Sequence, residues 1–139
     1  MLAFGSHDQG LTHRCVMHTV GAMPASRQST AALPLAPAVY LILLALLDGD
    51  AHGYRIRAEV IERSGGTVRL DPGSLYRLIA RLVADGLITE APSRPRDDDD
   101  ERRRYYRITV AGRRLVEAET NRMASWVAAA RAAHRRRAT

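Results

Sequence analysis

Two arginines, Arg77 and Arg81, are the residues best suited to recognition chemistry. They stand four positions apart in a segment that predicts a helix over residues 71–85, so they share one face, close to Ser74 and Tyr76. An arginine can form two parallel hydrogen bonds with O6 and N7 of a guanine, and it can also pair with phosphate. We therefore expect Ser74, Tyr76, Arg77 and Arg81 to contact double-stranded DNA.

Each of these side chains also has a structural interpretation. Arg77 and Arg81 are alternatively surface arginines paired with Asp85 or another acid. Arg81 alternatively contacts only phosphate, because the N-terminal end of a recognition helix reaches the bases first. Tyr76 alternatively packs against the hairpin that follows.

A second basic group surrounds an acidic run. It is expected to contact DNA phosphates and consists of Arg94, Arg96, Arg102, Arg103 and Arg104. Five acids in a row, Asp97 to Glu101, separate its two halves and repel phosphate, so the tip itself should stay off the DNA backbone. The acids alternatively neutralise these arginines, limit non-specific binding, or form a solvated turn.

The C-terminal segment predicts one long helix, to about Ala133, with a seam of its own. Its apolar positions recur at heptad spacing and comprise Val116, Met123, Trp126 and Ala130, with Glu119 interrupting them. A small domain leaves this seam uncovered, so a second copy of the helix is the simplest partner. Trp126 is either an anchor of that dimer interface or the lining of an effector pocket between two copies.

Catalytic and metal-binding signals are weak. His13, Cys15 and His18 lie close enough to ligate a soft metal, but they lack a fourth ligand, so we predict no metal site and no cofactor. The sequence has no glycine-rich phosphate loop and no nucleophile elbow. We therefore do not expect an enzyme.

Composition agrees with a polyanion-binding globular protein. The chain has 139 residues, 46% hydrophobic and 26% charged, with a net charge of +6 carried entirely by arginine. The charge is uneven: +1 over residues 1–37, −4 over 38–101 and +9 over 102–139. The longest apolar run, residues 38–47, has ten residues, which is about half of a membrane span. We expect a cytoplasmic protein with no membrane segment.

The expected elements position these residues as follows. A tail over residues 1–36 precedes an apolar helix over 38–47 and a helix over 51–63, which is capped at Asp48–Asp50 and buries Tyr54, Ala58 and Ile61. A brief strand over 67–70 leads to the third helix, which starts at Asp71-Pro72 and buries Leu75, Ile79 and Leu82. Strands over 87–91 and 104–110, with Tyr106 and Ile108 on one face, form a long hairpin before the last helix.

This order is that of a mainly α fold with a small β-hairpin, the winged helix-turn-helix, in which the third helix enters the major groove. We assign residues 37–110 to that domain, 111–134 to a dimerisation helix and 135–139 to a basic tail.

Several motifs in register resemble those of the PadR family of transcriptional regulators, in the short form with a single C-terminal helix. They are Leu43–Gly49, Ala51-His52-Gly53-Tyr54, Asp71–Tyr76, Asp85–Ile88, Glu101–Thr109 and Gly112. The resemblance implies a homodimeric DNA-binding protein, usually a repressor of a pseudo-palindromic operator, and often a small effector that changes DNA affinity. Two alternatives remain: a winged-helix module that binds a protein, and a small-molecule-binding dimer without specific DNA binding.

Overall fold

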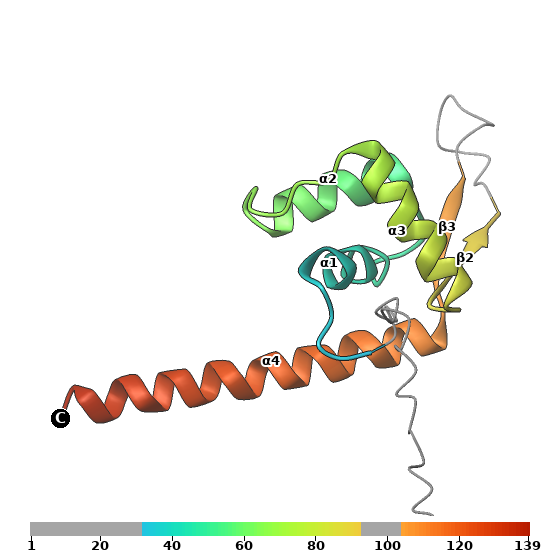
Figure 1. Cartoon of the computed structure of the whole chain (residues 1–139). Coiled ribbons are helices and arrows are strands. Elements are labelled where there is room, and N and C mark those ends of the chain that lie inside the picture. The colour runs from blue at the N-terminus through green and yellow to red at the C-terminus, as the bar shows by residue number, and fades with distance from the viewer. Residues whose placement is uncertain (1–31, 93–103) are drawn as a thin grey trace, which may run out of the picture.

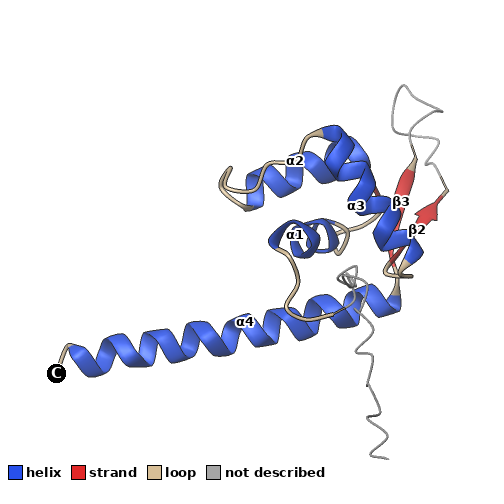
Figure 2. Ribbon diagram, in the orientation of Figure 1, coloured by secondary structure: helices blue, strands red, loops and turns tan. Residues whose placement is uncertain are grey.

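A computed structural model describes residues 32–92 and 104–139 (Figure 1). Its elements, in chain order, are α1 (Pro37–Ala45), β1 (Ala51–His52), α2 (Gly53–Arg63), α3 (Pro72–Ala84), β2 (Ile88–Ala91), β3 (Tyr105–Ile108) and α4 (Val110–Arg137). Three short helices pack beside a small sheet, and α4 runs beneath them and continues past them (Figures 1 and 2). The predicted winged helix with a C-terminal helix is confirmed. None of the described helices is long and apolar enough to cross a membrane.

The core lies between α1, α2, α3 and the sheet. Its fully buried side chains include Ile42 and Leu43 of α1, Ile56 of α2, and Leu75 and Leu82 of α3. The stripe predicted for α3, with Ile79 as its third member, is confirmed. Since apolar burial is the main stabilising term in folding, this stripe fixes which face of α3 points outward.

The sheet is antiparallel, with strand order β1-β3-β2. β3 lies in the middle because it pairs Ile108 with Ile88 on one side and Tyr106 with Ala51 on the other. The two-residue strand β1 was not predicted, and the strand predicted over 67–70 does not form. A strand as short as β1 exists only because β3 supplies its hydrogen bonds, which local sequence does not reveal.

The burial predicted for α2 is wrong for Tyr54 and Ala58, whereas the third residue, Ile61, is half-buried. Tyr54 is 71% exposed and Ala58 is also exposed, while Ile56 and Val60 are fully buried. Tyr54 with Ala58 and Ile56 with Val60 are both pairs at i, i+4 spacing, and the two pairs lie on opposite faces of the helix. The spacing alone therefore does not decide which face is buried. The helix also starts later than predicted: the side chain of His52, not of Asp48 or Asp50, accepts the capping hydrogen bond from the Arg55 amide at 3.2 Å.

The first third of α4 belongs to the domain core. Thr109 caps the helix by accepting from the Gly112 amide, and Gly112, Val116 and Glu119 are buried. Val116 is 3% exposed and belongs to the domain's own core cluster, so the prediction that it faces a partner helix is wrong. The helix also runs to Arg137, beyond the predicted end near Ala133, so Arg135 and Arg136 are helical.

Residues 32–36 were predicted as part of a tail, but one of them joins the core. Leu35 is only 8% exposed and lies against the buried cluster. The segment therefore acts as a strap that ties the entry to α1 onto the start of α4. The rest of the predicted tail, including His13, Cys15 and His18, lies outside the described residues.

Candidate nucleic-acid interface

The N-terminal end of α3 is held by a short hydrogen-bond network. Asp71 accepts from the Ser74 amide at 2.9 Å and from the Ser74 hydroxyl at 2.6 Å, and Pro72 occupies the first turn. These bonds from Ser74 are the main reason that the pKa of the Asp71 carboxyl lies below its ordinary value, and the charge of Arg77 adds to the effect. The cap satisfies helix amides that would otherwise lack partners, so the end of α3 is well defined.

Arg77 extends from the exposed face of α3 and touches this network. Its guanidinium donates to the Ser74 hydroxyl at 3.2 Å, so Ser74 donates to Asp71 and accepts from Arg77. Ser74 thus positions Arg77 in addition to donating to the N-cap residue, Asp71. Arg77 bonds to the Ser74 hydroxyl and lies near enough to the Asp71 carboxylate to lower its pKa, and a guanidinium has further donors for a ligand.

Tyr76 packs on the first residue of α2, Gly53. A β-carbon at Gly53 would stand 2.8 Å from the Tyr76 hydroxyl, so the ring lies directly over this glycine. Tyr76 nevertheless stays 52% exposed. Gly53 is therefore needed for the approach of α3 to α2, and one edge of Tyr76 remains on the outer surface.

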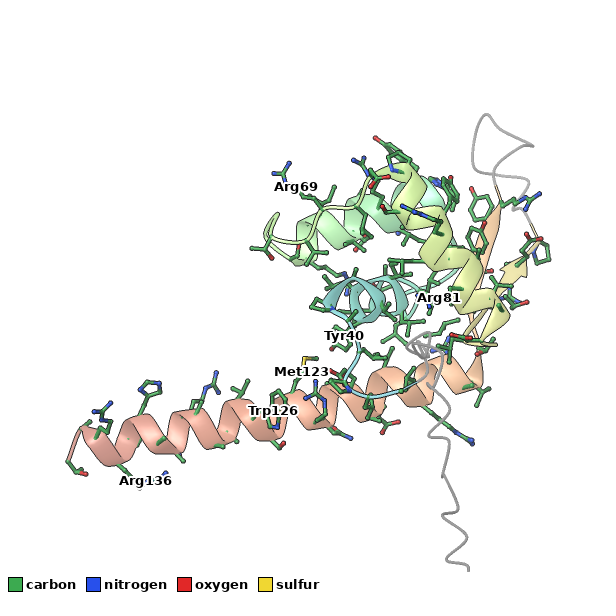
Figure 3. The ribbon with its side chains drawn as sticks, in the orientation of Figure 1. Tyr40, Arg69, Arg81, Met123, Trp126 and Arg136 are labelled. Atoms are coloured by element: carbon green, nitrogen blue, oxygen red, sulfur yellow. The ribbon has the colours of Figure 1, made fainter. Side chains whose placement is uncertain are left out.

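Arg81 lies toward the C-terminal end of α3 (Figure 3). It is exposed, as are the small residues Ala80 and Ala84 beside it. A face of small side chains flanked by Arg77 and Arg81 allows a duplex to approach closely. Whether Arg81 contacts a base or a phosphate stays a prediction.

Side-chain contacts hold the base of the hairpin together. Arg107 of β3 donates to both carboxylate oxygens of Asp50, at 2.9 and 2.7 Å, and these bonds raise the pKa of the Arg107 guanidinium. The His52 ring meets the Tyr105 ring edge-on, with centroids 5.5 Å apart. Tyr106 is buried as predicted, and burial is the main cause that raises its phenol pKa.

Only one of the predicted phosphate-binding arginines of the hairpin lies in the described part of the chain. Arg104 is largely exposed and faces Glu90 across the strands at 3.4 Å. An exposed pair of this kind contributes little to stability, so Arg104 can exchange Glu90 for a phosphate at low cost. The others, Arg94, Arg96, Arg102 and Arg103, lie outside the described residues, as does the acidic run.

Arg69 was not predicted as a contact residue. It lies in the loop before α3, is exposed, and points away from the domain (Figure 3). Its guanidinium donates to the Gly66 carbonyl at 3.2 Å. Its position in the sequence, two residues before the N-cap Asp71, could have indicated a residue near the start of α3. The segment was instead predicted to be a strand.

The second predicted surface lies on α4, apart from α3 (Figure 3). Trp126 is 64% exposed and Val127 is 48% exposed, Ala130 is exposed, and Met123 is half-buried. A large aromatic side chain left in water on a projecting helix is typical of an interaction surface. Val116, as described above, is not part of it.

Glu119 lies where α4 leaves the domain. It is 1% exposed, and Arg122 donates to both of its carboxylate oxygens, one of them at 2.9 Å. These bonds hold the pKa of the Glu119 carboxyl below its ordinary value against the opposing effect of burial, and the Leu35 amide contributes a further hydrogen bond. Beside it, the hydroxyls of Tyr40 and Thr120 are 3.0 Å apart, which joins α1 to α4.

Comparison with known proteins gives one family. Residues 42–118 match the PadR-like family of transcriptional regulators. A PadR family transcription regulator from Clostridium difficile has a similar structure, with a TM-score of 0.56 and 28% identity over 66% of this chain and 94% of that chain. The complex structure of hsRosR-SG is also similar, with a TM-score of 0.53 and 26% identity over 70% and 79% of the two chains.

A longer relative is known from sequence. An uncharacterized 37.1 kDa protein in transposon TN4556 of Streptomyces fradiae is 45% identical over 84 residues, which is 60% of this chain. The matched part is 22% of that protein, so this chain spans about a fifth of its relative's length.

Proposed function

This chain belongs to the PadR-like family of transcriptional regulators, and from that premise we propose that it binds operator DNA with α3 and represses transcription. The family is one of regulators and not of enzymes. In this proposal Arg77 contacts a base edge, Arg81 a base or a phosphate, and Tyr76 the sugar-phosphate backbone beside them. Arg69 and Arg104 contact phosphates on either side.

One observation carries the proposal: the outer face of α3 presents a positioned arginine among small side chains. Arg77 is tethered through Ser74 to the helix cap, and Ala80 and Ala84 leave room around it. A base contact needs a donor pair held at a defined place, and this network supplies one.

We further propose that the regulator is a homodimer joined through the exposed part of α4. What supports this is the exposure of Trp126 and Val127 on a helix that projects past its own domain (Figure 1). A two-fold dimer would place two copies of α3 in successive major grooves, about 34 Å apart, which requires a pseudo-palindromic operator.

Release by a small effector completes the proposal. An effector that binds beside Trp126, between the two copies of α4, would favour a different angle between the protomers. The two copies of α3 would then no longer match the spacing of the grooves, and the DNA would dissociate.

Fluorescence anisotropy tests the DNA-binding step. A labelled duplex from the upstream region of the chain's own gene is titrated with protein at two salt concentrations, beside a scrambled duplex. We expect tighter binding to the native duplex, with an affinity that falls steeply as salt is raised, because phosphate contacts release counterions. Equal and weak binding to both duplexes, together with failure of genomic selection to find a site, would refute the proposal and favour a protein partner.

A further inference from the structure

Arg122 holds two contacts on opposite sides of itself. Toward the N-terminus of α4, its guanidinium pairs with the buried Glu119. Toward the C-terminus, it lies over the Trp126 ring, 4.2 Å from the ring centroid. Because these residues are three and four positions from Arg122, the three side chains follow one face of the helix. Glu119 and Trp126, seven positions apart, are joined only through Arg122 among the described contacts.

The two ends of this chain of contacts face different environments. Glu119 has almost no contact with water, whereas Trp126 is 64% exposed. Glu119 also receives a hydrogen bond from the Leu35 amide of the strap. Of the elements packed around it, α1 carries no charged residue and only one titratable side chain, Tyr40, which contacts Thr120. Arg122 is thus the charge that balances the buried carboxylate.

The two contacts of Arg122 are unequal. A buried carboxylate that loses its cationic partner is left as an uncompensated charge out of reach of water, and this strongly destabilises the folded state. A cation over an exposed aromatic ring is a weaker contact. The pairing with Glu119 therefore decides where the Arg122 guanidinium lies. Its position over the Trp126 ring is a consequence of that pairing.

We propose that Arg122 couples the exposed Trp126 surface to the buried joint between α4, α1 and the strap. Anything that covers Trp126 and draws Arg122 toward itself weakens the pairing of Glu119. Loss of the Glu119 charge in turn releases Arg122 from the ring. The inference deepens the proposed function, on which it rests only in taking the Trp126 surface as the place where a second copy or an effector binds.

Acrylamide quenching of Trp126, the only tryptophan of the chain, reports the coupling directly. The full-length protein is compared with Glu119→Gln, Arg122→Gln and the double variant, and Arg131→Gln, exposed on the same helix, is the control. We expect Glu119→Gln to raise the quenching constant to the value of Arg122→Gln, although Glu119 does not touch the indole. The double variant should equal Arg122→Gln, and Arg131→Gln should equal the wild type.

Two results would overturn the coupling. One is a quenching constant that equals the wild-type value in Glu119→Gln but differs from it in Arg122→Gln. The other is a double variant in which the two effects add. No DNA is present in the experiment, so its failure leaves the DNA-binding proposal untouched, and failure of DNA binding leaves the coupling untouched.

A pH titration of the wild type keeps the test independent of whether Glu119→Gln folds. Trp126 emission is followed from pH 7 downward while circular dichroism at 222 nm reports the helices. We expect the emission to change below the ordinary Glu range before helical signal is lost. Emission that stays constant until the helices melt contradicts the proposal.

Discussion

In the proposed complex Arg77 contacts a base edge, so its removal should affect binding to specific and non-specific DNA differently. Arg77→Ala is expected to weaken binding to the native duplex by about 1–3 kcal/mol and to leave non-specific binding nearly unchanged. Anisotropy on native and scrambled duplexes measures both values. Arg114→Ala, an exposed arginine of α4, is the control. Equal losses on the two duplexes would show that Arg77 contacts only phosphate.

Gly112 shows what a single missing methyl group allows. A β-carbon there would stand 2.2 Å from the Leu87 carbonyl oxygen and 2.7 Å from the Ile108 side chain. Since the carbonyl belongs to the backbone, α4 and the segment just before β2 would have to separate. We expect Gly112→Ala to lower the free energy of unfolding by about 3 kcal/mol or more, as measured by urea denaturation. The exposed neighbour Ala111, changed to Ser, should shift it by less than about 0.5 kcal/mol.

Single residues were predicted well where their role is local. Asp71 and Pro72 indicate where α3 starts. Once that start is known, helix geometry alone predicts the face on which Arg77 lies. The partners of Ser74 and Tyr76 were not predicted, because one contacts Arg77 through its hydroxyl and the other lies over Gly53 of a different helix. Spacing along a helix predicts the face on which a residue lies, but it does not predict which residues of a neighbouring element contact that residue.

The N-cap at Asp71 is expected to stabilise α3 as a whole. Asp71→Ala removes an acceptor used twice by Ser74, and we expect a loss of about 1 kcal/mol in the free energy of unfolding. Asp71→Asn keeps an acceptor at the same place and should retain most of the stability. The comparison uses urea denaturation at neutral pH. Equal stability of the Ala and Asn variants would mean that the cap does not hold α3.

The joint between α4 and the strap makes stability depend on pH. The folded-state pKa of Glu119 lies below its ordinary value of 4.5, so its ionised form stabilises the fold fully above that value. This contribution is lost as the pH falls below 4.5 toward the folded-state pKa. We therefore expect Glu119→Gln to reduce the drop in unfolding free energy between pH 7 and pH 3, measured by urea denaturation. Asp71 contributes in the same direction, so the drop should shrink and not vanish.

The control for this prediction is Glu117→Gln, an exposed glutamate on the same helix. Its curve of stability against pH should follow that of the wild type. If both variants gave wild-type curves, Glu119 would have the same pKa folded and unfolded, and the joint would owe nothing to its charge.

The boundaries and buried face of an element were predicted correctly where its own residues determine them. They were predicted wrongly where a neighbouring element determines them. α3 carries a cap, a stripe and a stop at Gly86, and all three were identified. α2 has two possible apolar faces, and the choice depends on α1 and α3, so Tyr54 was placed in the core wrongly. Val116 was assigned to a dimer interface because nothing in the sequence of α4 indicates that it packs in the core of its own domain.

At the scale of the whole molecule, the Trp126 surface should hold two copies together. Trp126→Ala is expected to weaken dimerisation by about 2 kcal/mol, a roughly 30-fold change, since a large aromatic side chain near the centre of an interface contributes this much. Sedimentation velocity over a dilution series measures it, and affinity for the native duplex should fall with it. Asn121→Ala, exposed on α4, is the control. Unchanged sedimentation of Trp126→Ala would place the interface elsewhere.

The part of α4 that leaves the domain also has a mechanical consequence. From Thr120 to Arg137 the helix is 18 residues long, which at 1.5 Å per residue makes an arm of about 27 Å. The arm is clamped at one end, by Glu119, Leu35 and Tyr40, and is stiff along its length. A tilt of about 10° at the clamp would displace the far end by about 5 Å, because the arm multiplies rotation by its length. Across one helical turn at the clamp, about 5.4 Å, that tilt corresponds to a displacement of only about 1 Å, which the arm magnifies into a shift larger than the rise of one base pair, about 3.4 Å.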